Sequence, residues 1–293
     1  MVQRGQKERI YNQRIYTFLG YMATTKQYNK VLTIAGSDSG GGAGIQADIK
    51  AISAMGAYAA SAITAVTVQN TLGVEAVHPI PIDILGGQID AVLSDIGADA
   101  VKIGMLHSSE VVRLVADRLR HYNIRNVVLD PVMVSTSGHR LIEESAIETL
   151  KSQLLPLARV ITPNIPEAEI LAGVKIERNE ELADVARRLS QGGSVSVLLK
   201  AGHLTEERLV DIFYNAEQDT ILELPSVRVN TPNTHGTGCT LSSAFAAALA
   251  CGMGLDDAAR AAKEYINGAI ISGADYAIGG GHGPVDHFFA LKK

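Results

Sequence analysis

A run of small residues in the last quarter of the chain carries the strongest chemical signal in the sequence. The segment from Asn233 to Thr240 (NTHGTGCT) leads directly into an alanine-rich stretch that predicts a helix. The backbone N–H groups of Gly236, Thr237 and Gly238 would be free at the start of that helix, where the helix dipole also favours negative charge. We therefore expect these three residues to cradle a phosphate-like oxyanion.

Cys239 falls in the first turn of the same predicted helix. The field at a helix N-terminus stabilises a thiolate and lowers the pKa of the thiol, which makes Cys239 a candidate base. A free cysteine is also a common small buried apolar residue, and glycines commonly serve turns. Taken alone, the motif leaves both interpretations open.

Other polar residues follow predicted strands. Asp130 ends an apolar run, Lys200 ends another, and Asn164 and Glu167 stand three residues apart after a third. An amide and carboxylates can hold Mg²⁺ through its water shell, and a lysine can neutralise phosphate charge. The ordinary alternatives are a turn-capping aspartate, a helix-capping asparagine and an exposed lysine.

A second glycine-rich loop, residues 36–44 (GSDSGGGAG), also lies between a predicted strand and a predicted helix. It lacks both the Gly-Lys-Ser/Thr ending of a P-loop and the G-x-G-x-x-G spacing of a dinucleotide fingerprint, so it argues against both kinds of nucleotide site. Asp48, a little over one turn into the helix, could turn its carboxylate toward the loop and accept a hydrogen bond from an amino or hydroxyl group. A solvated helical acid is the alternative.

The elements that would position these residues alternate short apolar runs with amphipathic stretches from Lys30 onward, which predicts an α/β fold around a mostly parallel sheet. The candidate residues follow the strands, and ligands of open α/β sheets bind at the carboxyl ends of strands, so we expect one shared rim. The predicted strands are 31–35, 62–68, 100–103, 126–129, 160–162 and 195–199.

Two parts of the chain depart from this alternation. Residues 74–77 follow a turn signal at 70–73 and predict an antiparallel flap, and three closely spaced runs (209–214, 220–224 and 227–229) predict an antiparallel edge. Residues 240–250 and 255–272 are rich in alanine and predict two closely packed helices.

Composition excludes several classes of partner. A net charge of −5 offers no basic face for nucleic acid, and no apolar run approaches the roughly 20 residues of a membrane span. The two cysteines form no disulfide framework, so we expect a cytoplasmic protein. We expect one domain over residues 30–293, preceded by an extension, residues 1–29, that is either an over-extended start before Met22 or a short presequence.

Taken together, the motifs resemble the hydroxymethylpyrimidine/phosphomethylpyrimidine kinases of thiamine biosynthesis, from Lys30 to about Ala290. The resemblance rests on GSDSGGGAGIQAD at 36–48, VQN at 68–70, KIGM at 102–105, DPVM at 130–133, TPNIPE at 162–167 and NTHGTGC at 233–239.

The resemblance implies a ribokinase-like three-layer α/β/α sandwich, usually a homodimer, that uses ATP and Mg²⁺. It would phosphorylate 4-amino-5-hydroxymethyl-2-methylpyrimidine and then the monophosphate. Residues matching the family's pyrimidine pocket are Gly36, Asp48, Gln69, Met105 and Val132, of which Asp48 and Gln69 would bind the polar edge of the ring. Cys239 would face the substrate hydroxymethyl, Asn164, Glu167 and Lys200 would serve the nucleotide, and Asp130 and Glu167 the metal.

Two other functions compete with this interpretation. Related cysteine-bearing kinases phosphorylate pyridoxal, whose ring carries a comparable hydroxymethyl group. A non-catalytic pyrimidine sensor on the same fold is a candidate of another class, but it would have no need for Cys239, Lys200, Asn164 and Glu167.

Overall fold

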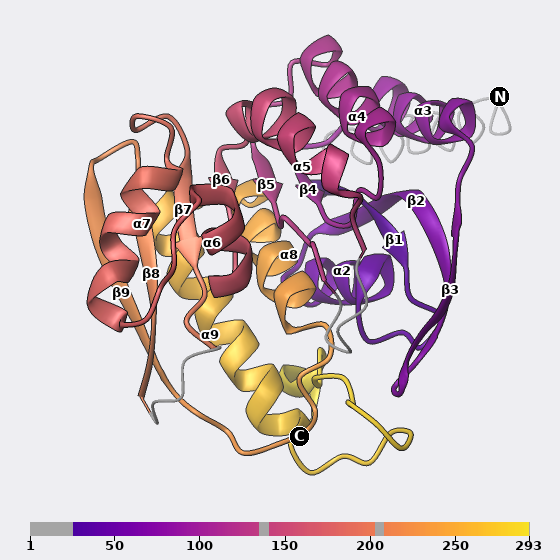
Figure 1. Ribbon diagram of the computed structural model, residues 1–293. Helices are drawn as coiled ribbons and strands as arrows, with labels where there is room; N and C mark the ends of the chain where they lie inside the picture. The colour runs from indigo at the N-terminus through magenta and orange to yellow at the C-terminus, as the bar shows by residue number, and fades with distance from the viewer. Residues whose placement is uncertain (1–25, 135–140, 203–207, 293) are drawn as a thin grey trace, which may run out of the picture.

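A nine-stranded sheet forms the centre of the computed structural model, which describes residues 26–134, 141–202 and 208–292 (Figure 1). Its strand order is β3-β2-β1-β4-β5-β6-β7-β8-β9. Strands β2, β1, β4, β5, β6 and β7 run parallel, whereas β3 at one edge and β8 and β9 at the other are antiparallel to their neighbours. The predicted mostly parallel sheet with an antiparallel edge is confirmed.

The inner strands β4 to β7 are short, and both of their faces are covered. Residues of β4 to β7 are buried throughout, as expected for continuous apolar runs in a parallel sheet. The strands are β1 (Lys30–Ser37), β2 (Tyr58–Asn70), β3 (Gly73–Pro79), β4 (Ala100–Ile103), β5 (Val127–Leu129), β6 (Val160–Ile161), β7 (Ser196–Leu199), β8 (Arg208–Asn215) and β9 (Thr220–Val227).

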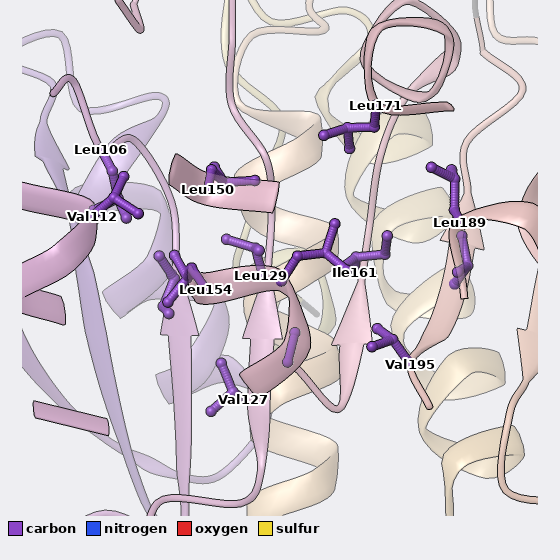
Figure 2. Packing of buried hydrophobic residues seen from close by; sticks show 14 of the residues in the cluster. Leu106, Val112, Val127, Leu129, Leu150, Leu154, Ile161, Leu171, Leu189 and Val195 are labelled. Carbon is purple, nitrogen blue, oxygen red and sulfur yellow. The ribbon is translucent and has the colours of Figure 1, made fainter. Parts of the chain in front are cut away.

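Helices cover both faces of the sheet and complete three layers. On one face α3 to α7 enclose one apolar cluster, part of which Figure 2 shows, and on the other α2, α8 and α9 enclose a second. The helices are α2 (Gly44–Ala54), α3 (Ile82–Ala91), α4 (Ser109–His121), α5 (Glu144–Thr149), α6 (Ile165–Ala172), α7 (Leu182–Leu189), α8 (Thr237–Ala250) and α9 (Leu255–Gly273), with short turns η1 (Val92–Ile96), η2 (Leu150–Leu154), η3 (Leu155–Leu157), η4 (Asn179–Glu181) and η5 (Phe289–Leu291).

Helix α8 runs through the middle of its layer and is almost completely buried from Thr240 to Ala250. Its alanines, such as Ala244 and Ala247, lack bulky side chains, so the helix packs closely against α2, α9 and the sheet. This packing fixes the position of the first turn of α8, which carries the strongest motif of the sequence.

One predicted strand is wrong. We expected separate strands at 220–224 and 227–229, but β9 continues through Pro225 and pairs with β8 up to Val227. Proline lacks a backbone N–H and therefore suggests a break, yet on an edge strand the missing donor faces away from the ladder and costs nothing. Residues 228–230 are not part of a strand.

The start of the predicted domain lies within the described residues, but most of the predicted N-terminal extension does not. The sheet begins at Lys30, as expected, whereas residues 1–25 of the predicted extension lie outside the described residues. Among the residues that the structure does describe, no helix is both long and apolar enough to cross a membrane.

The buried residue His287 connects the segment after α9 to α8 and α9 through hydrogen bonds. Its Nε2 lies 3.0 Å from the Thr240 hydroxyl, and its carbonyl accepts a hydrogen bond from the Tyr265 hydroxyl. Burial, and secondarily the charge of Lys50, lowers the pKa of His287 to about 4.

This buried histidine predicts an acid-sensitive fold. The unfolded chain binds a proton at His287 near pH 6.5, whereas the folded chain does so only near pH 4. The contribution of His287 is therefore present above pH 6.5 and is lost as the pH falls, about 2 kcal/mol between pH 7 and pH 4.5. Urea unfolding at both pH values should give a smaller pH dependence for His287→Gln than for the wild type. The exposed His121 provides the control, since His121→Gln should leave the slope unchanged; equal slopes for all three proteins would refute the expectation.

Candidate active site

The candidate residues lie at or just beyond the carboxyl ends of adjacent parallel strands, as predicted. Gly36 and Gln69 are the next-to-last residues of β1 and β2, and Met105 follows β4. Farther along the same rim, Asp130 and Val132 follow β5, Asn164 and Glu167 follow β6, and Lys200 follows β7. The matched pyrimidine residues thus lie mainly toward β2, and the expected nucleotide residues lie toward β7.

The loop that opens α8 lies between these two groups and contacts both. A Cβ atom on Gly236, whose φ is 78°, would overlap the carbonyl of Gly42 in the first glycine loop. A Cβ atom on Gly238 would come within 3.3 Å of Lys200 Nζ and 3.4 Å of Asp130 Oδ2. Only glycine permits the approach at position 236, and a side chain at position 238 would crowd the Lys200 ammonium, so residues 236–238 join the two halves of the rim.

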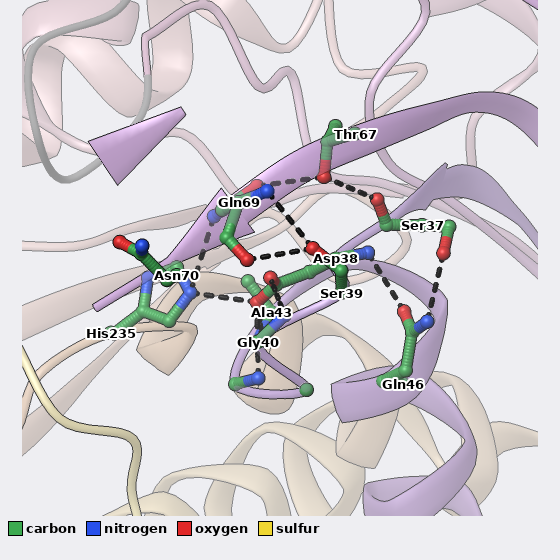
Figure 3. A network of polar contacts seen from close by, with 12 residues as sticks. Ser37, Asp38, Ser39, Gly40, Ala43, Gln46, Thr67, Gln69, Asn70 and His235 are labelled. Carbon is green, nitrogen blue, oxygen red and sulfur yellow. Dashed lines mark hydrogen bonds and ion pairs between the residues drawn. The ribbon is translucent and has the colours of Figure 1, made fainter. Parts of the chain in front are cut away.

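A polar network holds the two glycine loops together (Figure 3). One carboxylate oxygen of Asp38 accepts from the Gly40 N–H, and the other accepts from the Gly42 and Ala43 N–H groups. His235 Nε2 lies 2.8 Å from Asp38 Oδ2, across 197 residues of sequence. Burial opposes ionisation of Asp38, but the imidazole and the N–H groups outweigh it and hold the carboxyl pKa below its usual value.

Cys239 lies where we expected it but does not have the expected acidity. It stands in the first turn of α8, and the N–H of Gly44, the first residue of α2, hydrogen-bonds its sulfur. Burial nevertheless raises the pKa of the thiol to about 11, and the attraction of Lys102 is opposed by the charges of Asp48 and Asp130. The predicted lowering of this pKa is wrong, because desolvation outweighs the helix termini.

Asp48 does not extend into solvent; it is fully buried. Lys102 Nζ lies 2.8 Å from its Oδ1, and the hydroxyls of Thr33 and Ser243 donate to the carboxylate at 2.6 and 2.7 Å. Burial opposes the charge on Lys102, but Asp48, Cys239 and Asp130 together raise its pKa. Ser243 lies one helical turn beyond Cys239, so the Asp48–Lys102 ion pair lies next to the thiol, and both charges act on it. Whether Asp48 also contacts a pyrimidine stays a prediction.

On the other side of the loop, Asp130 pairs with Lys200. Asp130 Oδ1 accepts from Lys200 Nζ at 2.9 Å and from the Thr162 hydroxyl at 2.9 Å. Burial opposes ionisation of the Asp130 carboxyl, but the two nearby lysines, Lys200 and Lys102, keep its pKa low. The other oxygen, Oδ2, is the one beside Gly238.

Asn164 and Glu167 form the capping box of α6. Asn164 Oδ1 accepts from the Glu167 N–H, and the Glu167 carboxylate accepts from the Asn164 N–H, both at 2.9 Å. Burial raises the pKa of Glu167 to about 7 despite the nearby charge of Lys200. The capping function is therefore present, and any role toward a nucleotide or a metal stays a prediction.

The matched pocket residues are only partly brought together. A Cβ atom on Gly36 would lie 3.1 Å from Met105 Cε, so these two residues are neighbours. Gln69 lies near His235 in the network described above, while Val132 lies beyond β4 at the end of β5. Thr67 and Gln69 share one face of β2, and the bulge in the β2–β3 pairing between Val68 and Gln69 sits at this point.

Of the three backbone N–H groups predicted to be free, one is occupied. The Thr237 N–H donates to Thr234 O at 3.3 Å, a long and weak bond. The N-terminus of α8 lies in this loop as predicted, and Lys200 lies beside Gly238. The loop thus presents a helix N-terminus that attracts anions, with Lys200 beside Gly238 and Lys102 close to Cys239.

Sequence reasoning missed the partners that set these charges. Lys102 and His235 both stand inside motifs that were recognised, but no role followed from them, because their acidic partners are 54 and 197 residues away. For Lys102, the useful signal was a lysine inside an apolar strand, since a buried lysine requires a paired charge.

Comparison with known proteins identifies the family of this chain. Residues 38–286 match the family model described as phosphomethylpyrimidine kinase. The hydroxymethylpyrimidine/phosphomethylpyrimidine kinase of Rhizobium meliloti (strain 1021) is 50% identical over 263 residues, which cover 89% of this chain and 98% of the relative.

Solved structures of two kinds of kinase resemble the chain. A Bacillus subtilis pyridoxal kinase in complex with ADP is 36% identical, with a TM-score of 0.83 over 91% of this chain and 100% of that one. A phosphomethylpyrimidine kinase from Clostridium difficile 630 is 45% identical, with a TM-score of 0.70 over 82% of this chain and 99% of that one. Sequence and structure together establish a kinase of the ribokinase-like fold, and the chain belongs to the phosphomethylpyrimidine kinase family.

Proposed function

We propose that the chain transfers phosphate from ATP to 4-amino-5-hydroxymethyl-2-methylpyrimidine and then to the resulting monophosphate. The observation that carries this proposal is the position of the α8 loop, which touches the pyrimidine side of the rim at Gly42 and the charged side at Lys200 and Asp130. A hydroxymethyl group on one side and a γ-phosphate on the other would meet at Cys239. The family relationship supplies the substrates.

In the first step, we place the substrate hydroxyl against the Cys239 sulfur. Because the resting thiol is protonated at neutral pH, it orients the hydroxyl rather than removing its proton in advance. Phosphoryl transfer has a loose transition state, so positioning and charge stabilisation contribute more than a strong base. The N-terminus of α8 and Lys200 would stabilise the transferring group. In the second step the nucleophile is already an anionic phosphate.

The family also implies Mg²⁺, and the donor set fits it. Asp130 Oδ2 is a hard carboxylate oxygen beside Gly238, and the Glu167 carboxylate stands near Lys200, within the same charged cluster. Mg²⁺ binds through one or two such carboxylates together with water and phosphate oxygens. When bound, it would neutralise phosphate charge, while Lys200 supplies the chain's own positive charge at that place.

Separation of products provides the test. Purified protein with Mg-ATP and the hydroxymethyl aminopyrimidine should release two equivalents of ADP and yield the diphosphate, with the monophosphate as intermediate. A parallel reaction with pyridoxal measures the competing activity, which the close structural match to a pyridoxal kinase favours. Turnover of pyridoxal alone would reassign the chain to pyridoxal phosphorylation.

We also infer a cytoplasmic homodimer. The compartment is inferred from the two cysteines, which are free, as expected in a reducing environment. The dimer is inferred from the β2–β3 flap, which exposes the apolar residues Val66, Val68 and Leu72 with exposed fractions of 43%, 55% and 71%. Light scattering coupled to size exclusion would give a monomer mass if the dimer inference is wrong.

A further inference from the structure

Gln69 lies at the junction of the two glycine loops, with its amide between two polar neighbours (Figure 3). In the structure Gln69 Nε2 lies 3.3 Å from His235 Nε2, and Gln69 Oε1 lies 3.1 Å from the Thr67 hydroxyl. The oxygen and nitrogen of such an amide are distinguished only by what their neighbours donate and accept. The other hydrogen bonds of the two neighbours favour the amide turned over, with its oxygen toward His235 and its nitrogen toward Thr67.

His235 must donate. Its Nε2 lies 2.8 Å from Asp38, whose carboxylate already accepts from three backbone N–H groups and is held ionised. A carboxylate in this state can only accept, so His235 Nε2 carries the hydrogen and donates it to Asp38. His235 Nε2 then has no lone pair for an amide N–H, whereas an amide oxygen would face a positively polarised N–H, so the oxygen is the better neighbour.

Thr67 must accept. A hydroxyl has one hydrogen, and the Thr67 hydroxyl lies 2.7 Å from the carbonyl oxygen of Ser37, which can only accept. That short bond takes the single hydrogen and leaves the lone pairs of the hydroxyl for Gln69. The Gln69 atom facing Thr67 must then be the amide nitrogen, in agreement with the assignment made at His235.

We propose that His235, held by Asp38, and Thr67 are positioning residues that fix the Gln69 amide with Oε1 toward His235 and Nε2 toward Thr67, and that this direction selects an aminopyrimidine. The proposal rests on the proposed function, because it takes Gln69 as a contact of the ring. Without the two neighbours, the amide could turn over and present its donor and acceptor in either order.

The fixed amide keeps one lone pair on Oε1 and one hydrogen on Nε2 for a ligand. This pair matches an amino group next to a ring nitrogen, the same edge that asparagine or glutamine binds on adenine. The amino group then lies on the His235 side and the ring nitrogen on the Thr67 side. Since the hydroxymethyl group is next to the amino group on the ring, this orientation directs it toward the loop that carries Cys239.

Pyridoxal has no amino group beside its ring nitrogen. It can satisfy at most part of the fixed amide, and a site built to hydrogen-bond a substrate group discriminates strongly against analogues that lack it. The direction of one amide thus contributes to the choice between the two substrates.

Thr67→Val and Thr67→Ser provide a matched pair, because valine has nearly the same shape and serine keeps the hydroxyl. Steady-state kinetics would compare the aminopyrimidine with its analogue lacking the amino group. In the wild type the aminopyrimidine should be strongly preferred in kcat/KM. Thr67→Val should reduce that preference roughly tenfold, mainly through a higher KM for the aminopyrimidine, as expected for loss of one orienting hydrogen bond. Thr67→Ser should restore it to within about twofold.

The outcomes separate the two proposals. If the wild type does not phosphorylate the aminopyrimidine, the proposed function fails; if it does and Thr67→Val keeps the full preference, the positioning role fails. Neutron diffraction of crystals grown from the wild-type protein gives a second measurement that needs no variant. Two deuterium atoms on the Gln69 atom nearest Thr67 would support the proposal, and two on the atom nearest His235 would overturn it.

Discussion

Replacing Cys239 with alanine is expected to lower kcat for phosphorylation of the hydroxymethyl substrate by about a hundredfold, the cost of losing the group that orients the reacting hydroxyl. Phosphorylation of the monophosphate should fall by less than about tenfold, because its nucleophile is already ionised. Single-turnover rates for each step, measured separately, would give the two ratios. The protein should stay folded, since Cys239 is a half-buried residue and alanine removes only its sulfur atom.

Cys239→Ser serves as the control for that result. Serine keeps a hydrogen-bonding group at the N-terminus of α8, so the first step should recover much of its rate. If alanine slows both steps to the same extent, the thiol has no special relation to the hydroxyl. It would then act on both reactions by positioning the loop.

Lys102→Met should destabilise the fold by about 3–5 kcal/mol, the usual cost of removing one partner from a buried ion pair. Asp48 would remain fully buried without its ion-pair partner, with only the Thr33 and Ser243 hydroxyls as hydrogen-bond donors. Urea unfolding at pH 7 measures the change. Lys151→Met, which removes an exposed pair with Glu148, should leave the midpoint unchanged.

A double variant tests the origin of this loss. Adding Asp48→Asn to Lys102→Met replaces the unpaired Asp48 carboxyl group with a neutral amide. The double variant should recover part of the stability, because a neutral amide costs less to bury than a carboxylate. A loss below 1 kcal/mol for Lys102→Met alone would mean that water reaches Asp48 in solution.

The parallel part of the fold was predictable because each inner strand is a continuous apolar run between turn residues. Four predicted strands agree with β4 to β7 to within a residue or two, and the rim that carries the candidate residues followed from them. Pro225 shows the limit of such patterns: whether proline ends a strand depends on its place in the sheet, and position in the sheet is not local information.

The chemistry of the site was harder to predict than its location. The acidity expected for Cys239 followed from its place at a helix terminus, which the sequence does indicate. Its burial and the opposing charges of Asp48 and Asp130 follow from tertiary packing, which the sequence does not reveal. The same holds for the Asp38–His235 contact, since only the folded chain brings the two glycine loops together.

The contact between Gly42 and Gly236 leaves no space for even one methyl group, so the two loops pack directly against each other. A pyrimidine that restricted the first loop would therefore also restrict the terminus of α8, and a phosphate group bound at that terminus would restrict the first loop in return. By thermodynamic reciprocity, any such coupling changes the affinity for both ligands by the same factor. We therefore expect the two substrates to bind cooperatively, with the reaction centre assembled when both are present.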